Sequence, residues 1–158
     1  MKIMKLTKTL LASLLAIFFA ITSCSDDSLD DGADEPIVQP LSNGIQVDID
    51  GETWRGTISS VAFSGSLTTL NAVKANSNIS IQVFLPKDSV NTFNIPTSIV
   101  TVSVRRNSNV LSNSSMGTLA LSANDSTAIN GSFNCDVTSF SSNDTLILTN
   151  GLIDYDFN

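Results

Sequence analysis

The chain of 158 residues contains no histidine, which removes the commonest general base and the commonest metal ligand of proteins. A nucleophilic serine would need another base, and the Gly-x-Ser-x-Gly turn is missing, since Phe63-Ser64-Gly65-Ser66 lacks the first glycine. A Ser–Lys dyad that uses Lys74 or Lys87 stays open as a minor alternative. We therefore predict a protein that is not an enzyme, with no catalytic residue, no metal and no cofactor.

Carboxylate pairs are the other route to catalysis, because two acidic side chains can hydrolyse a glycoside without histidine. Asp48, Asp50 and Glu52 lie close together in the sequence, as do Asp154 and Asp156. Acids at alternate positions of a strand share one face, and here the polar face carries them, so a solvated surface is the favoured interpretation. The loop pattern of a calcium site is missing as well.

Cysteine is scarce, with one residue at position 24 and one at position 135. Two cysteines can form at most one disulfide, so the chain has no disulfide framework. Cys135 alternates with Phe133 and Val137 on an apolar face. This pattern favours a buried, inert thiol over a nucleophile.

Aromatic residues make up only 6% of the chain, which leaves few platforms for stacking on a sugar. Phe84 is out of register with its apolar neighbours and Phe140 falls near a turn, so these two are the candidates for an exposed contact. The alternative for Phe84 is packing against a second sheet or a loop. The aromatic residues predicted to lie in the core are Trp54, Phe63, Phe133, Tyr155 and Phe157.

Basic residues are outnumbered, with eight lysines and arginines against fifteen acids and a net charge of −7. Loss of Lys2, Lys5 and Lys8 with a leader leaves five basic residues against fifteen acids, so the net charge becomes −10. Such a chain repels nucleic acid and anionic head groups. We expect no nucleic-acid partner.

Residues 1–23 have the pattern of a signal peptide, in which basic residues precede an apolar run from residue 10 to residue 21. That run of roughly twelve residues is too short for a membrane-spanning helix, which needs roughly twenty. Its end, Ile21-Thr22-Ser23-Cys24, resembles the lipobox of bacterial lipoproteins, with Ile21 where leucine is more usual. The resemblance implies acyl chains on Cys24 that hold the protein to a membrane. An ordinary secretory signal is the alternative.

Residues 24–40 are predicted to be the lipidated cysteine and an acidic flexible tether. Ser25, Asp26 and Asp27 directly behind Cys24 resemble the export signal of surface lipoproteins of the Bacteroidota. The resemblance implies a lipid-anchored protein of the outer membrane, exposed at the cell surface. A solvated linker that faces the periplasm is the alternative.

Four Asp-Ser or Asp-Thr dipeptides resemble the acceptors of an O-glycosylation system found in the same bacteria. In each dipeptide the hydroxyl residue is followed by Leu, Val or Thr, and the four hydroxyl residues are Ser28, Ser89, Ser126 and Thr145. Ser28 falls in the tether and the other three fall in predicted turns.

Residues 41–158 are predicted to form one all-β domain, because apolar and polar residues alternate with a period of two over residues 45–49, 79–85, 100–104, 133–137 and 153–157. Asp50-Gly51 is a strong hairpin signal. Short connections favour an antiparallel β-sandwich of about eight or nine strands, with an up-and-down β-barrel as the alternative. Trp54 is predicted to cover a gap at Gly131 in a late strand, with an exposed ligand platform as the alternative.

Three short motifs extend the resemblance: Gly51-Glu52-Thr53-Trp54, Gly131-Ser132-Phe133 and Thr149-Asn150-Gly151. With the lipobox, they resemble a family of Bacteroidota lipoproteins known only as an all-β domain of unknown function. The resemblance implies an exported β domain and supplies no activity. We expect a surface lipoprotein with a non-catalytic binding or scaffolding domain, whose partner is an envelope protein or a glycan. The alternatives are a glycan-binding module and, behind it, a carboxylate-based hydrolase.

Overall fold

The computed structural model describes residues 40–107, 109–139 and 144–158, and these ranges contain nine β-strands. The strands are β1 (Gly44–Ile49), β2 (Glu52–Ser64), β3 (Leu67–Val73), β4 (Ile79–Pro86), β5 (Thr92–Ile95), β6 (Thr101–Arg106), β7 (Asn109–Asn124), β8 (Ala128–Thr138) and β9 (Thr145–Asp156). Within the same ranges, no helix is long and apolar enough to cross a membrane. The prediction of an all-β domain is confirmed.

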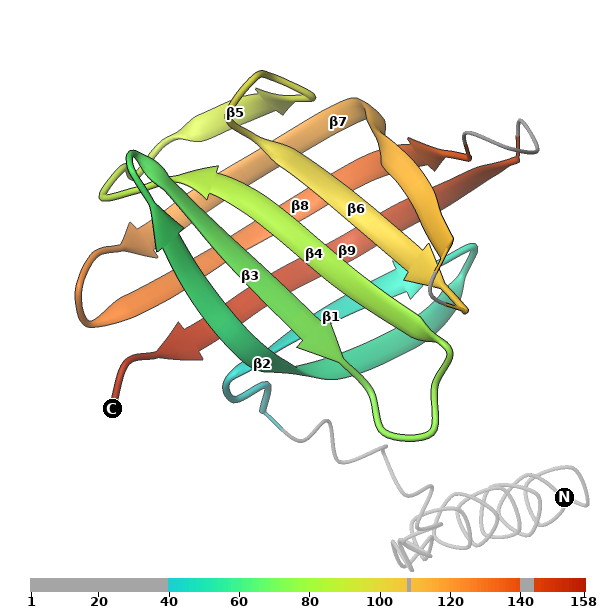
Figure 1. The fold of residues 1–158 in the computed structure, drawn as a ribbon, viewed down its shortest axis with the longest axis horizontal. Helices are drawn as coiled ribbons and strands as arrows, with labels where there is room; N and C mark the ends of the chain where they lie inside the picture. Colours follow the sequence, from blue (N-terminus) through green and yellow to red (C-terminus); the bar gives the residue numbers. More distant parts are fainter. Residues whose placement is uncertain (1–39, 108, 140–143) are drawn as a thin grey trace, which may run out of the picture. The chain divides into compact units, whose positions relative to one another are not determined.

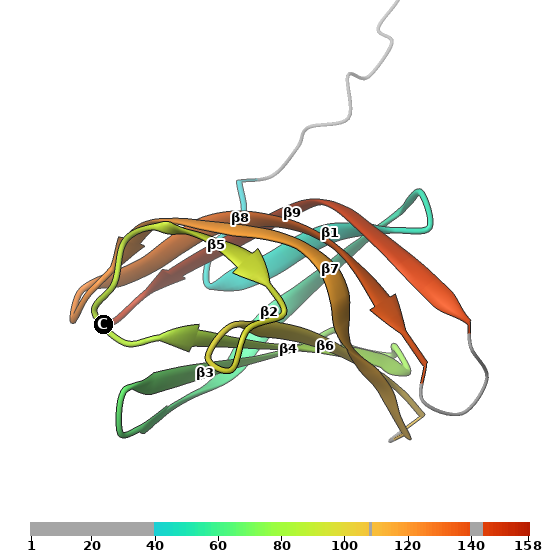
Figure 2. The same ribbon diagram turned by 90° about the horizontal axis from the view of Figure 1, so that it is seen from above.

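All nine strands belong to one antiparallel sheet in the order β5-β7-β6-β4-β3-β2-β1-β9-β8. The sheet curls into a half-barrel, and β7 also pairs with β8 (Figures 1 and 2). Neighbouring strands in the sheet follow one another along the chain except where β4 pairs with β6, where β5 pairs with β7, and where the first strand, β1, pairs with the last, β9. The predicted two-sheet sandwich is therefore wrong, because the backbone pairing has no break that would separate two sheets.

Two long, irregular strands explain why one sheet curls where two were expected. β2 pairs with β1 over Glu52–Thr57 and with β3 over Thr57–Ser64, and β7 likewise pairs first with β6 and then with β8. The β2–β3 register shifts between Ile58 and Ser60. Bulges of this kind bend a strand and increase its twist. Each long strand can therefore pass from one wall of the curl to the other.

The inner face of the curl holds the hydrophobic core, as the period-two alternation predicted. Its largest fully buried side chains come mainly from β1, β3, β4, β6, β7, β8 and β9, with Phe133 the bulkiest. Cys135 is buried beside them, so the predicted buried thiol is confirmed. Tyr155 and Phe157, predicted to lie in the core, are only partly buried and pack against it from the end of the sheet.

The first hairpin forms where it was predicted. Ile49 pairs with Glu52, so the turn has two central residues, Asp50 and Gly51. Both have positive φ, at 52° and 88°, which is the backbone conformation of a type I′ turn. The Asp50 carboxylate also accepts a hydrogen bond from the Ile147 amide at 3.0 Å, which ties the turn to β9.

Trp54 is buried, as predicted, but its neighbour is not the predicted one. The indole is 5% exposed, and its six-membered ring fills the space that a side chain at Gly56 would occupy. Beside Gly131 the nearest side-chain atom is Leu121 Cδ2, so the predicted cover of Gly131 by Trp54 is wrong. Trp54 and Gly56 are two residues apart on one strand and therefore share its inner face.

Phe63 was predicted to be a core residue, and 54% of it is exposed. Its strand partner on β3 is Thr68, which is fully buried, so Phe63 lies on the inner face of the sheet. The pairing of β2 with β3 continues to Ser64, past the end of the packed core. Phe63 therefore has the predicted face but lies at the open end of the curl.

Candidate functional site

Four chain segments meet at the end of the curled sheet where β2 stops, and they enclose a cavity of about 690 Å³. Phe63 comes from β2, Lys87 and Val90 from the β4–β5 connection, Asn124 from the end of β7, and Phe157 from the C-terminal end. We call this site the aromatic mouth. Its volume lies within the usual range of small-molecule sites, and the open ends of curled sheets are frequent places for them.

Apolar side chains remain uncovered in the aromatic mouth. Val90 is 60% exposed beside the half-exposed Phe63. The ring centroids of Phe63 and Phe157 are 5.9 Å apart with an interplanar angle of 31°, and Tyr155 meets Phe157 edge-on at 5.0 Å. The Lys87 ammonium lies 5.7 Å from the Phe63 ring centroid. The exposed Phe63 ring is therefore held by an aromatic neighbour and a cation and is not a freely rotating surface residue.

Buried hydrogen bonds fix the walls of the aromatic mouth. The Asn124 side-chain amide is 4% exposed and donates to the carbonyl of Pro86 at 2.6 Å and to that of Ser89 at 3.0 Å. The Lys87 amide donates to the carbonyl of Ser66 at 2.8 Å, which links the same connection to the β2–β3 turn. A site held in this way requires little ordering when a ligand binds.

Charged and polar groups border the apolar floor. Asp125 accepts hydrogen bonds from the Thr127 amide at 2.7 Å, the Thr127 hydroxyl at 2.6 Å and the Ala128 amide at 3.1 Å. The Thr127 hydroxyl, followed by these amides, lowers the pKa of Asp125 below 3.8, so its carboxylate is charged at neutral pH. Lys87 lies 3.9 Å from Asp88 on the opposite border. The aromatic mouth thus combines an apolar floor with hydrogen-bonding groups at its border.

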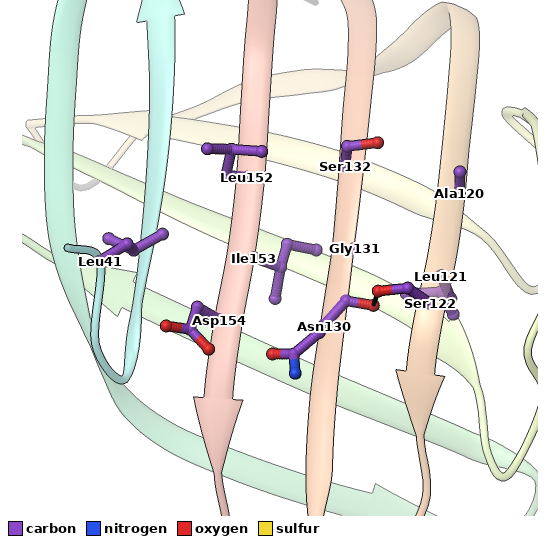
Figure 3. Close-up of a pocket in the computed structure, with 10 residues that line it drawn as sticks. All are labelled: Leu41, Ala120, Leu121, Ser122, Asn130, Gly131, Ser132, Leu152, Ile153 and Asp154. Atoms are coloured by element: carbon purple, nitrogen blue, oxygen red, sulfur yellow. Dashed lines mark hydrogen bonds between the residues drawn. The ribbon is translucent and has the colours of Figure 1, made fainter.

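A second depression, of about 570 Å³, lies on the outer face of β7, β8 and β9 (Figure 3). Ala120, Leu152 and Asn130 stand around it, and Gly131 lies between them on the middle strand. The Ser122 hydroxyl donates to the Asn130 carbonyl at 3.2 Å across the same surface. The residues that line this depression include no aromatic side chain, which makes it a weaker candidate than the aromatic mouth.

Two of the five acidic residues considered for hydrolysis, Asp48 and Asp50, are engaged in structural contacts. Asp48 accepts from the Asn150 side chain at 2.8 Å and from the Thr53 hydroxyl at 2.6 Å, while Asp50 holds the Ile147 amide. The Asn150 contact, followed by the Thr53 contact, lowers the pKa of Asp48 below 3.8. An acid–base pair needs one carboxyl group with a raised pKa, and Asp48 is shifted the other way. In the part of the chain that the structure describes, no three acidic or cysteine residues cluster as a metal site would require.

The structure describes only some of the residues that the sequence analysis singled out. Phe84 is half-buried and lines a small cavity together with Leu67 and Ile99. Ser126 is exposed in the aromatic mouth, Ser89 is half-buried behind it, and Thr145 is exposed at the start of β9. The residues that lie outside the described ranges are Cys24, Ser25, Asp26, Asp27, Ser28 and Phe140.

Sequence reasoning did not assign Phe63, Val90 and Phe157 to a site. Val90 lies in a connection where apolar and polar residues do not alternate, and the two phenylalanines follow the alternation that is typical of core residues. A usable signal was the turn residues beside each of them in the chain, which are Gly65 after Phe63, Asp88 and Asn91 around Val90, and Asp156 and Asn158 around Phe157. Those residues mark the ends of strands, where an inward-facing ring is not covered by the next layer.

Comparison of the chain with protein-family models, with curated proteins and with solved structures finds no match in any of the three.

Proposed function

We propose that this protein is a lipid-anchored surface lipoprotein whose β domain is a non-catalytic binding module, with the aromatic mouth as its binding site. The observation that carries the proposal is the half-exposed Phe63 ring, held at 5.9 Å from Phe157 over an open cavity. Large exposed apolar groups in a fixed, concave setting are typical of binding sites. The anchor rests on the lipobox at Cys24 and on the acids that follow it.

A glycan is the ligand that this chemistry favours. Sugars present apolar C–H faces and hydroxyl edges, and the aromatic mouth offers a phenylalanine ring bordered by Asn124, Asp125 and Asp88. A scaffolding role needs no fixed cavity, and hydrolysis needs an acid–base pair that Asp48 and Asp50 do not supply. The aromatic pair flanked by Asn and Asp therefore supports the glycan-binding alternative over the other two.

The test is binding of the detergent-extracted, full-length protein to an array of neutral oligosaccharides. We expect Phe63→Ala to weaken binding by at least about fivefold, because truncation of a central aromatic contact usually costs 1 kcal/mol or more. Met116→Ala is the matched control, since Met116 is 67% exposed on β7 and does not line the aromatic mouth. Equal binding by the wild type and Phe63→Ala, or retention of no oligosaccharide, contradicts the proposal.

A further inference from the structure

The end of the curled sheet opposite the aromatic mouth holds a separate cavity of about 460 Å³. β2 begins at this end with Glu52 and finishes at the other end near Phe63, so the full length of the strand separates the two sites (Figure 1). The cavity is lined by Glu52 and Trp54 of β2, Lys74 of the β3–β4 turn, Ile79 of β4 and Arg106 of β6. We call it the indole mouth.

A buried hydrogen-bond donor without a partner lies in the wall of the indole mouth. Trp54 is 95% buried, and its indole N–H finds no acceptor among the residues that the structure describes. Buried N–H groups in proteins nearly always have a partner, because an unpaired one loses its hydrogen bond to water without replacement. The Nε1 atom has less than 1 Å² of accessible surface, so a ligand oxygen that pairs with this N–H must displace part of the cavity wall.

Two cations and two carboxylates line the same opening, since Asp50 and Glu52 stand there beside Lys74 and Arg106. Lys74 and Arg106 both line the indole mouth, although only five basic residues remain after residue 23. Neither is within ion-pair distance of a carboxylate in the described ranges. Two cations that form no ion pair can bind the anionic group of a ligand, while the two carboxylates of the same cavity repel a second negative charge.

We propose that the indole mouth binds a small monoanionic carboxylate that also carries hydroxyl or ammonium groups. The Arg106 guanidinium matches the two oxygens of a planar carboxylate, and Lys74 adds a second positive charge. The Trp54 N–H provides a third donor to an oxygen of the same ligand. Glu52 at the border disfavours dianions and accepts hydrogen bonds from hydroxyl or ammonium groups.

Trp54 is the only tryptophan of the chain, so its signals report on this site alone. The full-length protein in detergent micelles, labelled with nitrogen-15, should show one indole N–H cross-peak. We expect D-glucuronate to shift that cross-peak downfield and to change the tryptophan emission, while D-glucose, which lacks the carboxylate, leaves both unchanged. Equal responses to the two sugars, or no shift with glucuronate up to tens of millimolar, overturn the proposal.

Charge variants separate this site from its surroundings. The double variant Lys74→Gln and Arg106→Gln should weaken glucuronate binding by at least about tenfold, since each loses a hydrogen bond to a charged group. Arg105→Gln removes the same charge from the adjacent residue of β6, which does not line the cavity, and should leave binding unchanged. Phe63→Ala should also leave it unchanged, so failure of one site is distinguishable from failure of the other. If Arg105→Gln weakened glucuronate binding as much, the effect would come from the net charge of the protein and not from the cavity, and the proposal would be overturned.

Discussion

The six-membered ring of Trp54 occupies the position of the side chain that Gly56 lacks. A Cβ atom at residue 56 would lie 2.8 Å from Cζ2 and 2.9 Å from Cζ3 of the indole, closer than the 3.0 Å below which real Cβ contacts essentially never fall. Both residues lie on the inner face of β2, two positions apart. The ring lies over its own strand, and the glycine is what makes room for it.

We expect Trp54→Ala to lower the free energy of unfolding by about 3–5 kcal/mol, the usual range for a large buried aromatic residue. Gly56→Ala should lower it by about 1–3 kcal/mol, because the added methyl group overpacks the site. Urea denaturation followed by circular dichroism measures both changes. Met116→Ala, on the exposed surface, should stay within about 0.5 kcal/mol of wild type. A Gly56→Ala protein as stable as wild type would show that the indole has room to move.

Asp48 should stabilise the fold only while it is ionised. Its pKa in the folded protein lies below 3.8 because of the Asn150 and Thr53 hydrogen bonds, so its contribution is present above 3.8 and is lost as the pH falls through the lowered pKa. Asn150→Gly removes the main donor and keeps a residue that tolerates the φ of 54°. We expect this variant to unfold at a higher pH than wild type in an acid titration. Coincident titration curves would contradict the assignment.

Cys135 should be unreactive in the folded protein. Burial, followed by the negative charge of Asp136, raises the pKa of its thiol to about 12, so almost no thiolate forms at mildly alkaline pH. In a Cys24→Ala background it is the only thiol, and an alkylating reagent should label it only after denaturation. Rapid labelling under native conditions would place Cys135 in an accessible site.

The proposed anchor and export signal predict the cellular location of variants at Cys24, Asp26 and Asp27. Cys24→Ala should partition into the aqueous phase of a detergent extraction, while wild type stays in the detergent phase, because the acyl chains supply the membrane affinity. Protease added to intact cells should digest the wild type, and replacement of Asp26 and Asp27 by alanine should protect the domain. If the Cys24→Ala protein stayed in the membrane fraction as the wild type does, lipidation would not be what anchors it. Equal protease resistance of both forms would remove the surface assignment.

O-glycosylation should differ between two of the four proposed acceptors. Ser126 is exposed in the aromatic mouth, whereas Ser89 is half-buried and its carbonyl is held by Asn124. We expect the mature protein to be heavier than the lipidated polypeptide and Ser126→Ala to reduce that excess more than Ser89→Ala does. A mature mass equal to that of the lipidated polypeptide would dismiss the modification.

The strands could be predicted from the sequence because their inward-facing apolar residues recur at every second position, as they do along β1. Their assembly into one curled sheet could not, because a sandwich and a curled sheet produce the same alternation. The difference lies in bulges such as the one between Ile58 and Ser60, which leave no clear mark in the composition. The same bulge changes which residues of β2 face inward. Strict alternation from Trp54 would place Phe63 on the outer face, and the bulge turns it to the inner face at the end of the core.

The two mouths differ in how far the sequence could reveal them. The aromatic mouth brings together Phe63 and Phe157, which are far apart in the chain, and depends on the buried amide of Asn124. The indole mouth depends on the position of Trp54 relative to Lys74 and Arg106. In both cases the residues come from separate strands and turns, and their distances follow from strand register, which the alternation does not fix.

The pairing of β7 with β8 has a consequence for how copies of the protein meet. Every described strand except β5 has a hydrogen-bonded neighbour on both sides, and β5 is only four residues long. A long free strand edge is the usual template for addition of a second chain and for growth of cross-β aggregates. The curl removes that template. At high concentration the molecules can therefore contact one another through side chains, but almost no unpaired strand backbone is left for hydrogen bonds between copies.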